Sequence, residues 1–261
     1  LELSDGWVQN VDYDMNYYLA AAYRKNGQPA EAKKVYDAIL GLKPEEKDAY
    51  FLRGSAELEL GDYESAKADF DKAISMDPKN YDRLIEIYEA LADYGYREVG
   101  QEYLQNVLNT DKKLDAYDSG RIYYYLGDYQ KAYLALEEAK GKGGVDSYLY
   151  LGKAYAATGD YNYASSVYSN YLSKQGPDAE IYNQLGLCEL AKKDYQKALE
   201  AFQAGKQIEG NSLMQTLSFN EIVAYEYLQD DQKAAVLLKA YLQNYPDDQA
   251  AIREQQFLST R

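Results

Sequence analysis

The side chains that most often perform catalysis are nearly absent from this chain. Its 261 residues include no His and a single Cys, Cys188. Histidine is the commonest general base and metal ligand, and a lone cysteine with no adjacent base is more often a small buried apolar residue than a nucleophile. The sequence also contains no glycine-rich phosphate loop and no G-x-S-x-G motif. It therefore predicts a protein that is not an enzyme and needs no metal or cofactor.

Tyrosine is the residue type whose abundance calls for an explanation, since the chain contains 31. Many tyrosines, such as Tyr63 and Tyr129, directly follow a Gly-Asp dipeptide at a recurring position, and these are interpreted as structural. Others are additional, notably Tyr117, Tyr124 and Tyr125. Exposed tyrosines can anchor a partner because they offer a large rigid area and a hydroxyl at low entropic cost. The additional tyrosines are therefore candidate binding residues.

The elements that would position these residues follow from one stretch, Lys47–Asn80. Its first half shows the apolar spacing of a helix and places Gly54 in the interior, where a glycine costs roughly 1 kcal/mol against alanine. A glycine kept there indicates close approach by another helix. Gly61-Asp62 breaks the pattern, a second helical half follows, and Pro78 ends it. The stretch is predicted to be a helix–turn–helix.

The rest of the chain repeats this unit. Residues 1–12 form a polar lead-in, in which Trp7 is expected to cover the open end of the first helix pair, and residues 249–261 form a capping helix. Between them lie seven copies, at 13–46, 47–80, 81–112, 113–144, 145–178, 179–212 and 215–248.

Two of the copies depart from the pattern. In the third, Gly100 replaces an expected alanine and Lys112 an expected proline. The fourth ends early in the glycine-rich segment Gly141–Gly144. This segment has two interpretations, which are a hinge between residues 13–140 and 145–261, or a glycine helix cap followed by a tight turn.

The repeating pattern resembles the tetratricopeptide repeat, or TPR. The fifth copy shows it clearly, with Tyr148, Leu151-Gly152, Tyr155, Gly159-Asp160-Tyr161, Ala164, Tyr168 and Pro177. The resemblance implies an all-α fold, a right-handed α-solenoid or superhelix of about seven units with a C-terminal capping helix. It also implies that the first helix of each unit lines a concave groove and that the protein is a scaffold that binds peptides or proteins.

The groove-facing positions of the first helices are partly apolar, and this stripe has two interpretations. It can pack neighbouring first helices together, or it can form a groove lined with aromatic side chains and a few charges. On the second interpretation the partner-binding residues are Tyr17, Tyr18, Arg24, Phe51, Tyr117, Arg121, Tyr124, Tyr125, Lys153, Asn183 and Asn220.

One known TPR binding mode is not expected here. Some TPR domains hold the acidic C-terminal tails of heat-shock chaperones with Lys, Asn and Arg on the groove face. The matching positions in this chain are Tyr17, Ala21, Leu52, Asp82 and Glu86. Two of these are acidic and would repel a carboxylate, so the resemblance does not extend to this clamp.

Charge narrows the class of partner. The chain has 28 Lys and Arg against 43 Asp and Glu, a net charge of −15. Such a surface repels phosphate backbones, so nucleic acid is excluded and a neutral or basic protein or peptide is favoured. The longest apolar run, Tyr17–Tyr23, is far shorter than the roughly 20 residues needed to cross a bilayer, so direct membrane insertion is not expected.

A second hypothesis is structural. The array can act as a self-associating assembly element, a homo-oligomer, and the tyrosine-rich, histidine-free composition is compatible with a bacterial cell-envelope complex. The sequence assigns no compartment, since both the cytoplasm and tethering through an upstream signal are compatible with it.

Overall fold

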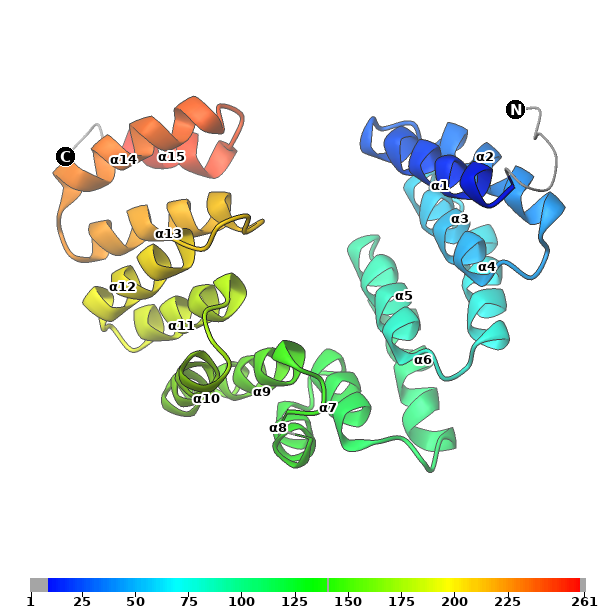
Figure 1. Ribbon diagram of the computed structural model, residues 1–261, viewed down its shortest axis with the longest axis horizontal. Helices are drawn as coiled ribbons and strands as arrows, with labels where there is room; N and C mark the ends of the chain where they lie inside the picture. The colour runs from blue at the N-terminus through cyan, green and yellow to red at the C-terminus, as the bar shows by residue number, and fades with distance from the viewer. Residues whose placement is uncertain (1–8, 140, 259–261) are drawn as a thin grey trace. The chain divides into compact units, whose positions relative to one another are not determined.

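The computed structural model describes residues 9–139 and 141–258, and this part of the chain contains fifteen α-helices and no strand (Figure 1). The predicted all-α repeat fold is confirmed. In chain order the helices are α1 Gln9–Lys25, α2 Pro29–Leu42, α3 Lys47–Glu59, α4 Tyr63–Met76, α5 Tyr81–Asp93, α6 Arg97–Thr110, α7 Ala116–Tyr125, α8 Tyr129–Glu138, α9 Val145–Ala157, α10 Tyr161–Lys174, α11 Ala179–Ala191, α12 Tyr195–Lys206, α13 Met214–Tyr227, α14 Asp231–Asn244 and α15 Gln249–Leu258.

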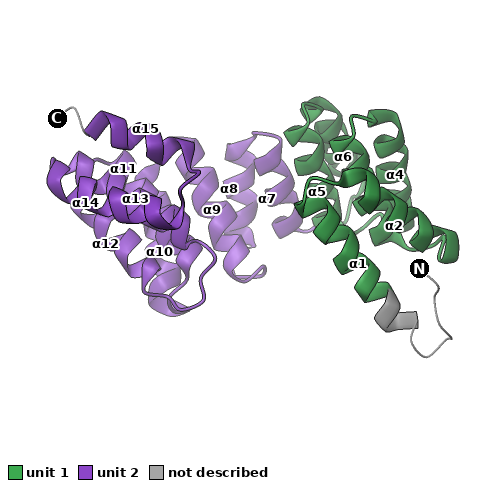
Figure 2. Cartoon of the chain, turned by 90° about the horizontal axis from the view of Figure 1, so that it is seen from above, with its two compact units in different colours: residues 1–113 green, residues 114–261 purple. Residues whose placement is uncertain are grey.

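The chain divides into two compact units, residues 1–113 and 114–261 (Figure 2). The first contains α1–α6 and the second α7–α15, and inside each unit every helix packs on its neighbours in the chain. The odd-numbered helices α1–α13 are called first helices below, and the even-numbered ones second helices. The prediction that Trp7 covers the first helix pair falls outside the described residues.

A Gly-Asp dipeptide forms the turn between paired helices in the second, fourth and fifth repeats. Gly61 adopts a φ of +77°, a conformation open to glycine at little cost, and the Asp62 carboxylate then accepts a hydrogen bond from the Ser65 amide at the start of α4. Where the glycine is missing, Lys193 and Gln229 adopt the same left-handed conformation, with φ of 64° and 62°. The turn therefore persists, at some cost in strain, when its preferred residue is lost.

A glycine on the first helix sets how closely a helix pair packs. A Cβ atom on Gly54 would lie 2.8 Å from the Phe70 ring of α4, and one on Gly152 would lie 2.2 Å from the Tyr168 ring of α10. Contacts this short are not tolerated, so each glycine makes room for a large side chain on the second helix. The prediction of a close helix approach at Gly54 is confirmed.

The third repeat reverses this arrangement. Tyr88 on α5 occupies the position of Gly54, and Gly100 on α6 occupies that of Ala66. A Cβ on Gly100 would lie 2.9 Å from the Tyr88 ring, so the ring now comes from the first helix and the space from the second. The apparent degeneracy of this repeat is thus a compensated exchange of large and small residues.

The segment Gly141–Gly144 lies inside the second unit, because the two units divide between Lys113 and Leu114. The Gly141 amide donates to the Ser147 hydroxyl at 3.2 Å, and that hydroxyl donates to the Gly144 carbonyl at 3.0 Å. The compact units therefore do not separate at this segment as the hinge interpretation expected. Its hydrogen bonds to Ser147 make it a turn between α8 and α9.

Candidate partner-binding faces

In the first unit, predicted binding residues join neighbouring first helices through charge. The Arg24 guanidinium of α1 donates to the Glu59 carboxylate of α3, with Nε–Oε1 at 2.7 Å. Asp48 of α3 accepts from Arg83 of α5 at 2.8 Å, and the Arg83 guanidinium lies 4.0 Å from the centre of the Phe51 ring. Arg24 and Phe51 therefore both take part in contacts within the protein.

In the second unit, tyrosines form the corresponding contact. The hydroxyls of Tyr125 on α7 and Tyr150 on α9 lie 3.0 Å apart. The Tyr124 ring packs edge-on against both rings, with centroids 5.5 Å away in each case. Burial raises the pKa of Tyr124. Of the predicted tyrosines, Tyr124 and Tyr125 lie together with Tyr150, and these contacts join α7 to α9.

The remaining predicted residues of the second unit also form contacts between helices. Lys153 of α9 lies 3.5 Å from the Glu180 carboxylate of α11. The Asn220 amide of α13 donates to the side-chain oxygen of the buried Asn183 on α11 at 2.8 Å. On these helices the predicted polar residues link neighbouring first helices.

Two predicted residues lie at opposite extremes of exposure. Arg121 is only 7% exposed, with its guanidinium 4.4 Å from the centre of the Tyr117 ring and a hydrogen bond of 2.5 Å to Asp118. Tyr18 is 77% exposed. Arg121 therefore acts inside the protein, whereas Tyr18 is presented to solvent.

A pocket opens on the first-helix side of the first unit. Its volume is about 690 Å³, and it lies between α1, the turn before α3, and α5. Its lining combines aromatic, acidic and basic side chains: Tyr13, Asp14, Tyr17, Lys43, Glu46, Asp48, Leu52 and Arg83. Two of the positions compared with the chaperone-tail clamp, Tyr17 and Leu52, are among them.

Tyr17 has the most unusual environment in this pocket. Its hydroxyl is buried and has no hydrogen-bond partner within the described residues. Burial, and then the nearby carboxylates of Glu46 and Asp48, raise its pKa well above the ordinary value for tyrosine. The hydroxyl therefore stays protonated at neutral pH and retains its capacity to donate a hydrogen bond to a ligand.

The cations of this pocket were missed by sequence reasoning. Lys43 comes from the end of α2 and lies 3.6 Å from the centre of the Tyr13 ring. Arg83 is held by Asp48 and by Glu86, the latter at 3.0 Å. Neither residue was predicted, because only groove-facing positions of the first helices were considered. Lys43 lies in a loop, and Arg83 is adjacent to Asp82, the position compared with the chaperone-tail clamp.

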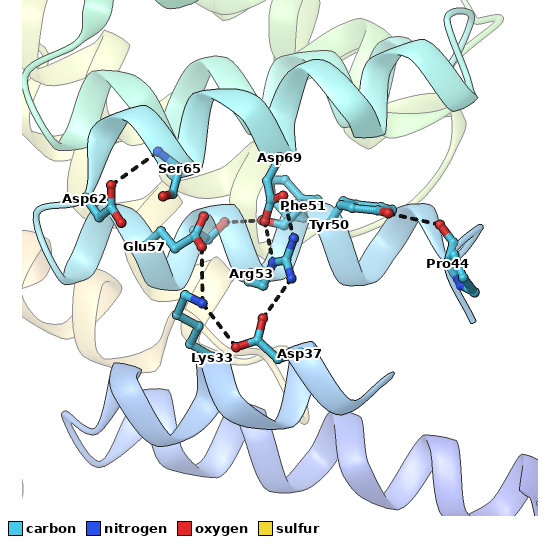
Figure 3. Close-up of polar contacts among 11 residues, drawn as sticks. Lys33, Asp37, Pro44, Tyr50, Phe51, Arg53, Glu57, Asp62, Ser65 and Asp69 are labelled. Atoms are coloured by element: carbon cyan, nitrogen blue, oxygen red, sulfur yellow. Dashed lines mark hydrogen bonds and ion pairs between the residues drawn. The ribbon is translucent and has the colours of Figure 1, made fainter. Parts of the chain in front are cut away.

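A partly buried ionic cluster joins α2, α3 and α4 (Figure 3). Arg53 donates two hydrogen bonds to the Asp69 carboxylate, at 2.6 and 2.8 Å, and a third to Asp37 at 2.7 Å. Lys33 lies 3.1 Å from Asp37 and 3.6 Å from Glu57. Two cations therefore bridge three carboxylates between neighbouring repeats.

Glu57 is the carboxylate of this cluster whose charge is least compensated by a cation. It is 3% exposed, and one of its carboxylate oxygens has no hydrogen-bond partner in the described part of the chain. Burial, followed by repulsion from Asp69, raises its pKa to about 7. Its position in the repeat is filled by Tyr155 in the fifth copy and by Glu189 in the sixth, so the repeat pattern alone does not determine whether a carboxylate lies here.

The one thiol of the chain is buried and unreactive in its setting. Burial raises the pKa of Cys188 to about 12, so the thiol is protonated at neutral pH. Over residues 9–139 and 141–258, no group of three or more His, Cys, Asp or Glu is arranged to hold a metal ion. None of the described helices is both long enough and apolar enough to span a bilayer.

Comparison with known proteins places the repeats in one family. Models of the tetratricopeptide repeat match residues 17–81, 149–212 and 219–248, more than half of the chain. The FK506-binding protein-like protein of Mus musculus is 42% identical over 62 residues. That match covers 24% of this chain and only 18% of the mouse protein.

Solved structures agree on the fold. A tetratricopeptide repeat protein from Parabacteroides merdae superimposes with a TM-score of 0.56 at 16% identity, over 82% of this chain and 84% of that one. The APC/C hetero-tetramer Cut9–Hcn1 gives a TM-score of 0.56 at 17% identity, over 92% of this chain and 48% of that one. With the repeat pattern, the paired helices and the family models in agreement, the chain belongs to the tetratricopeptide repeat family.

Proposed function

We propose that this protein is a non-catalytic scaffold that binds a protein or peptide through its first-helix face in the first unit. The observation that carries the proposal is the pocket of about 690 Å³ into which Tyr17 brings a buried hydroxyl without a partner. A buried hydroxyl in this state loses free energy that a ligand's hydrogen bond would restore. The matching Cut9–Hcn1 structure is an assembly of two proteins, which is consistent with this role.

The charge of the pocket defines the partner further. Three carboxylates, those of Asp14, Glu46 and Asp48, line it with two cations, Lys43 and Arg83. Both Arg83 and Lys43 are already engaged, by carboxylates and by the Tyr13 ring respectively. A neutral or basic peptide therefore fits this pocket better than an acidic one.

The candidate binding residues separate into two groups on this proposal. Tyr17 contacts the partner directly, and Phe51 supports Arg83 from behind. Tyr124, Tyr125 and the Asn183–Asn220 pair chiefly hold helices together, so substitutions there are expected to change stability more than binding.

A peptide selection tests the proposal. Peptides selected from a random library on the intact protein are expected to be neutral or basic, and Tyr17→Phe is expected to weaken them roughly fivefold, because it removes one hydrogen bond. Tyr125→Phe is the matched control, since it removes the hydroxyl of a tyrosine outside the pocket. Equal affinity of the wild type and Tyr17→Phe for every selected peptide would refute the assignment.

Self-association is the second candidate, favoured by exposed apolar side chains near the C-terminal end. Val236 on α14 and Phe257 on α15 are exposed, Phe257 at 47%. Light scattering across a hundredfold range of concentration would detect an oligomer. A monomer at every concentration rejects this candidate and leaves the scaffold proposal in place.

A further inference from the structure

Two carboxylates in the pocket that Tyr17 lines, the Tyr17 pocket, have no cation bound to them within the described residues. The pocket of about 690 Å³ is lined by the carboxylates of Asp14, Glu46 and Asp48. Asp48 accepts a hydrogen bond from Arg83. The side chains of Asp14 and Glu46 form neither an ion pair nor a hydrogen bond with any described residue. The lining therefore carries two negative charges that are not compensated.

Glu46 also differs from the residues that precede other first helices. At the starts of α5, α7 and α11, the side chains of Asn80, Asp115 and Asp178 each accept a hydrogen bond from the backbone amide three residues later. Glu46 precedes α3 at the same position but makes no such bond. Its half-buried side chain lines the pocket instead. A position that caps a helix in three other repeats therefore presents a carboxylate to the pocket here.

The pocket already accommodates one ammonium group. Lys43 reaches it from the end of α2, and its Nζ atom lies 3.6 Å from the centre of the Tyr13 ring. The face of a tyrosine ring attracts a cation, so this position is favourable without a carboxylate. Lys43 makes no ion pair with a carboxylate of the pocket in the described part of the chain. The site is therefore compatible with an ammonium group, and Lys43 is a like charge that repels a second one.

Resting on the proposed function of this pocket, we propose that Asp14 and Glu46 bind the ammonium group of a lysine side chain in the partner peptide. The four-carbon stem of this lysine packs against Leu52 and the Tyr17 ring, which line the same pocket. The Tyr17 hydroxyl, which is buried and has no partner within the described residues, donates to a backbone carbonyl of the peptide.

The placement of the two carboxylates favours lysine over arginine. Asp14 comes from α1 and Glu46 from the turn before α3. A compact ammonium group has three donors that can point to separate acceptors, whereas a planar guanidinium pairs best with both oxygens of one carboxylate.

Peptides selected from a random heptapeptide library on the intact protein are the probes for a test. They are expected to share a lysine at one position, and the affinity of a labelled selected peptide is measured by fluorescence anisotropy. Replacing its lysine by norleucine keeps the stem, removes the charge and is expected to weaken binding roughly tenfold. Glu46→Gln and Asp14→Asn are each expected to weaken the lysine peptide roughly fivefold and to leave the affinity of the norleucine peptide unchanged.

Two further variants separate this site from a general effect of charge or structure. Glu45→Gln is the matched control, because Glu45 is exposed, lies outside the pocket and carries the same charge as its neighbour Glu46. It is expected to change the affinity less than about twofold. Lys43→Gln removes the like charge and is expected to strengthen the lysine peptide roughly twofold, whereas general damage to the pocket would weaken it.

Four results would overturn the proposal. Selected peptides that share no lysine but respond to Tyr17→Phe would refute it and leave the proposed function in place. Equal losses in Glu46→Gln and Glu45→Gln would show attraction to the acidic surface as a whole. Tighter binding of the peptide with arginine in place of its lysine would refute the choice of an ammonium group. Failure to select any peptide, or peptides insensitive to every substitution in the pocket, would refute both this proposal and the proposed function.

Discussion

The two units join their helices by different chemistry. In the first unit, the contacts between repeats are ion pairs: Arg24 with Glu59, Arg83 with Asp48, and the cluster around Arg53. In the second unit ion pairs such as Lys206 with Glu221 are joined by neutral contacts, the paired hydroxyls of Tyr125 and Tyr150 and the paired amides of Asn183 and Asn220. The same repeat backbone thus relies on ion pairs between first helices in the first unit, and adds tyrosine and amide contacts between first helices in the second.

Because of this difference, residues at similar positions of the repeat pattern stabilise the two units by different interactions. Charges that bridge repeats depend on pH and salt, whereas hydroxyl and amide contacts depend on neither near neutrality. The first unit, which also holds the Tyr17 pocket, should therefore respond more strongly than the second to changes of pH and salt. Four measurements test this difference.

The largest effect is expected from Arg53→Ala. The substitution leaves the buried carboxylate of Asp69 without its cation, which costs about 3–5 kcal/mol. Urea unfolding gives the free energy, and hydrogen exchange of α3 and α4 locates the loss in the first unit. Lys153→Ala in the second unit removes a partly exposed pair and should change stability by no more than about 0.5 kcal/mol. A cost below 1 kcal/mol for Arg53→Ala would contradict the contrast.

The next effect is a pH dependence centred on Glu57. Its pKa is about 7 in the folded protein against 4.5 for an ordinary glutamate, so the folded state retains a proton that the unfolded state has lost between these values. Stability therefore falls as pH rises from about 4.5 to 7, by about 2–3 kcal/mol.

Glu57→Gln should remove that slope, because glutamine keeps the shape without the titration. The free energy of unfolding of each protein is measured from pH 4.5 to 8. The difference between the two proteins at each pH cancels the contribution of other carboxylates. Lys33 and Arg53 lower the pKa of Glu57 while Asp69 and Asp62 raise it. Parallel curves for the two proteins would show that Glu57 is ionised throughout.

A smaller loss is expected from Asn220→Ala in the second unit. The buried Asn183 oxygen loses its donor, which costs about 1–2 kcal/mol. The loss should be the same in 0.05 M and 1 M salt, because both groups are neutral. Asn162→Ala, at an exposed position on α10, is the control and should be close to neutral. A loss that shrinks at high salt would undermine the neutral character assigned to this unit.

The smallest effect is the direct response to salt. Raising NaCl from 0.05 to 1 M should weaken the partly exposed Arg24–Glu59 pair by about 0.5 kcal/mol, since the charges are screened. Hydrogen exchange should then speed up modestly in α1 and α3 and change less in α7, whose contact with α9 is made by tyrosines. Equal changes in both units would mean that salt acts through something other than these pairs.

Much of the fold was predictable from the sequence because local signals repeat. The Gly61-Asp62 turn, the helix start at Tyr63 and the small residue at Gly54 each follow from a rule that acts over a few residues. The two-unit division at Lys113 was not predictable in the same way. It depends on which helices pack together, whereas the glycines at 141–144 suggested a hinge at another place in the chain.

The candidate binding residues were less predictable, for a physical reason. A tyrosine or asparagine that faces the groove can contact either a partner or a neighbouring first helix. Which of these it contacts depends on the residue opposite it, which lies some 35 residues away in the chain. Asn183 and Asn220 were predicted to contact a partner, but their side chains hydrogen-bond to each other. The Tyr17 hydroxyl has no hydrogen-bond partner within the described residues. The periodicity of the sequence therefore does not show which residues of neighbouring repeats contact each other.

The exchange of ring and glycine in the third repeat also determines which parts of the array are interchangeable. A chimera that joined α3 to α6 would set Gly54 against Gly100 and leave a void, and one that joined α5 to α4 would press Tyr88 onto Phe70. Single helices therefore cannot be shuffled between these repeats, but whole pairs can. Recombination or engineering that lengthens or shortens this array should succeed when its junctions fall between helix pairs and fail when they fall inside one.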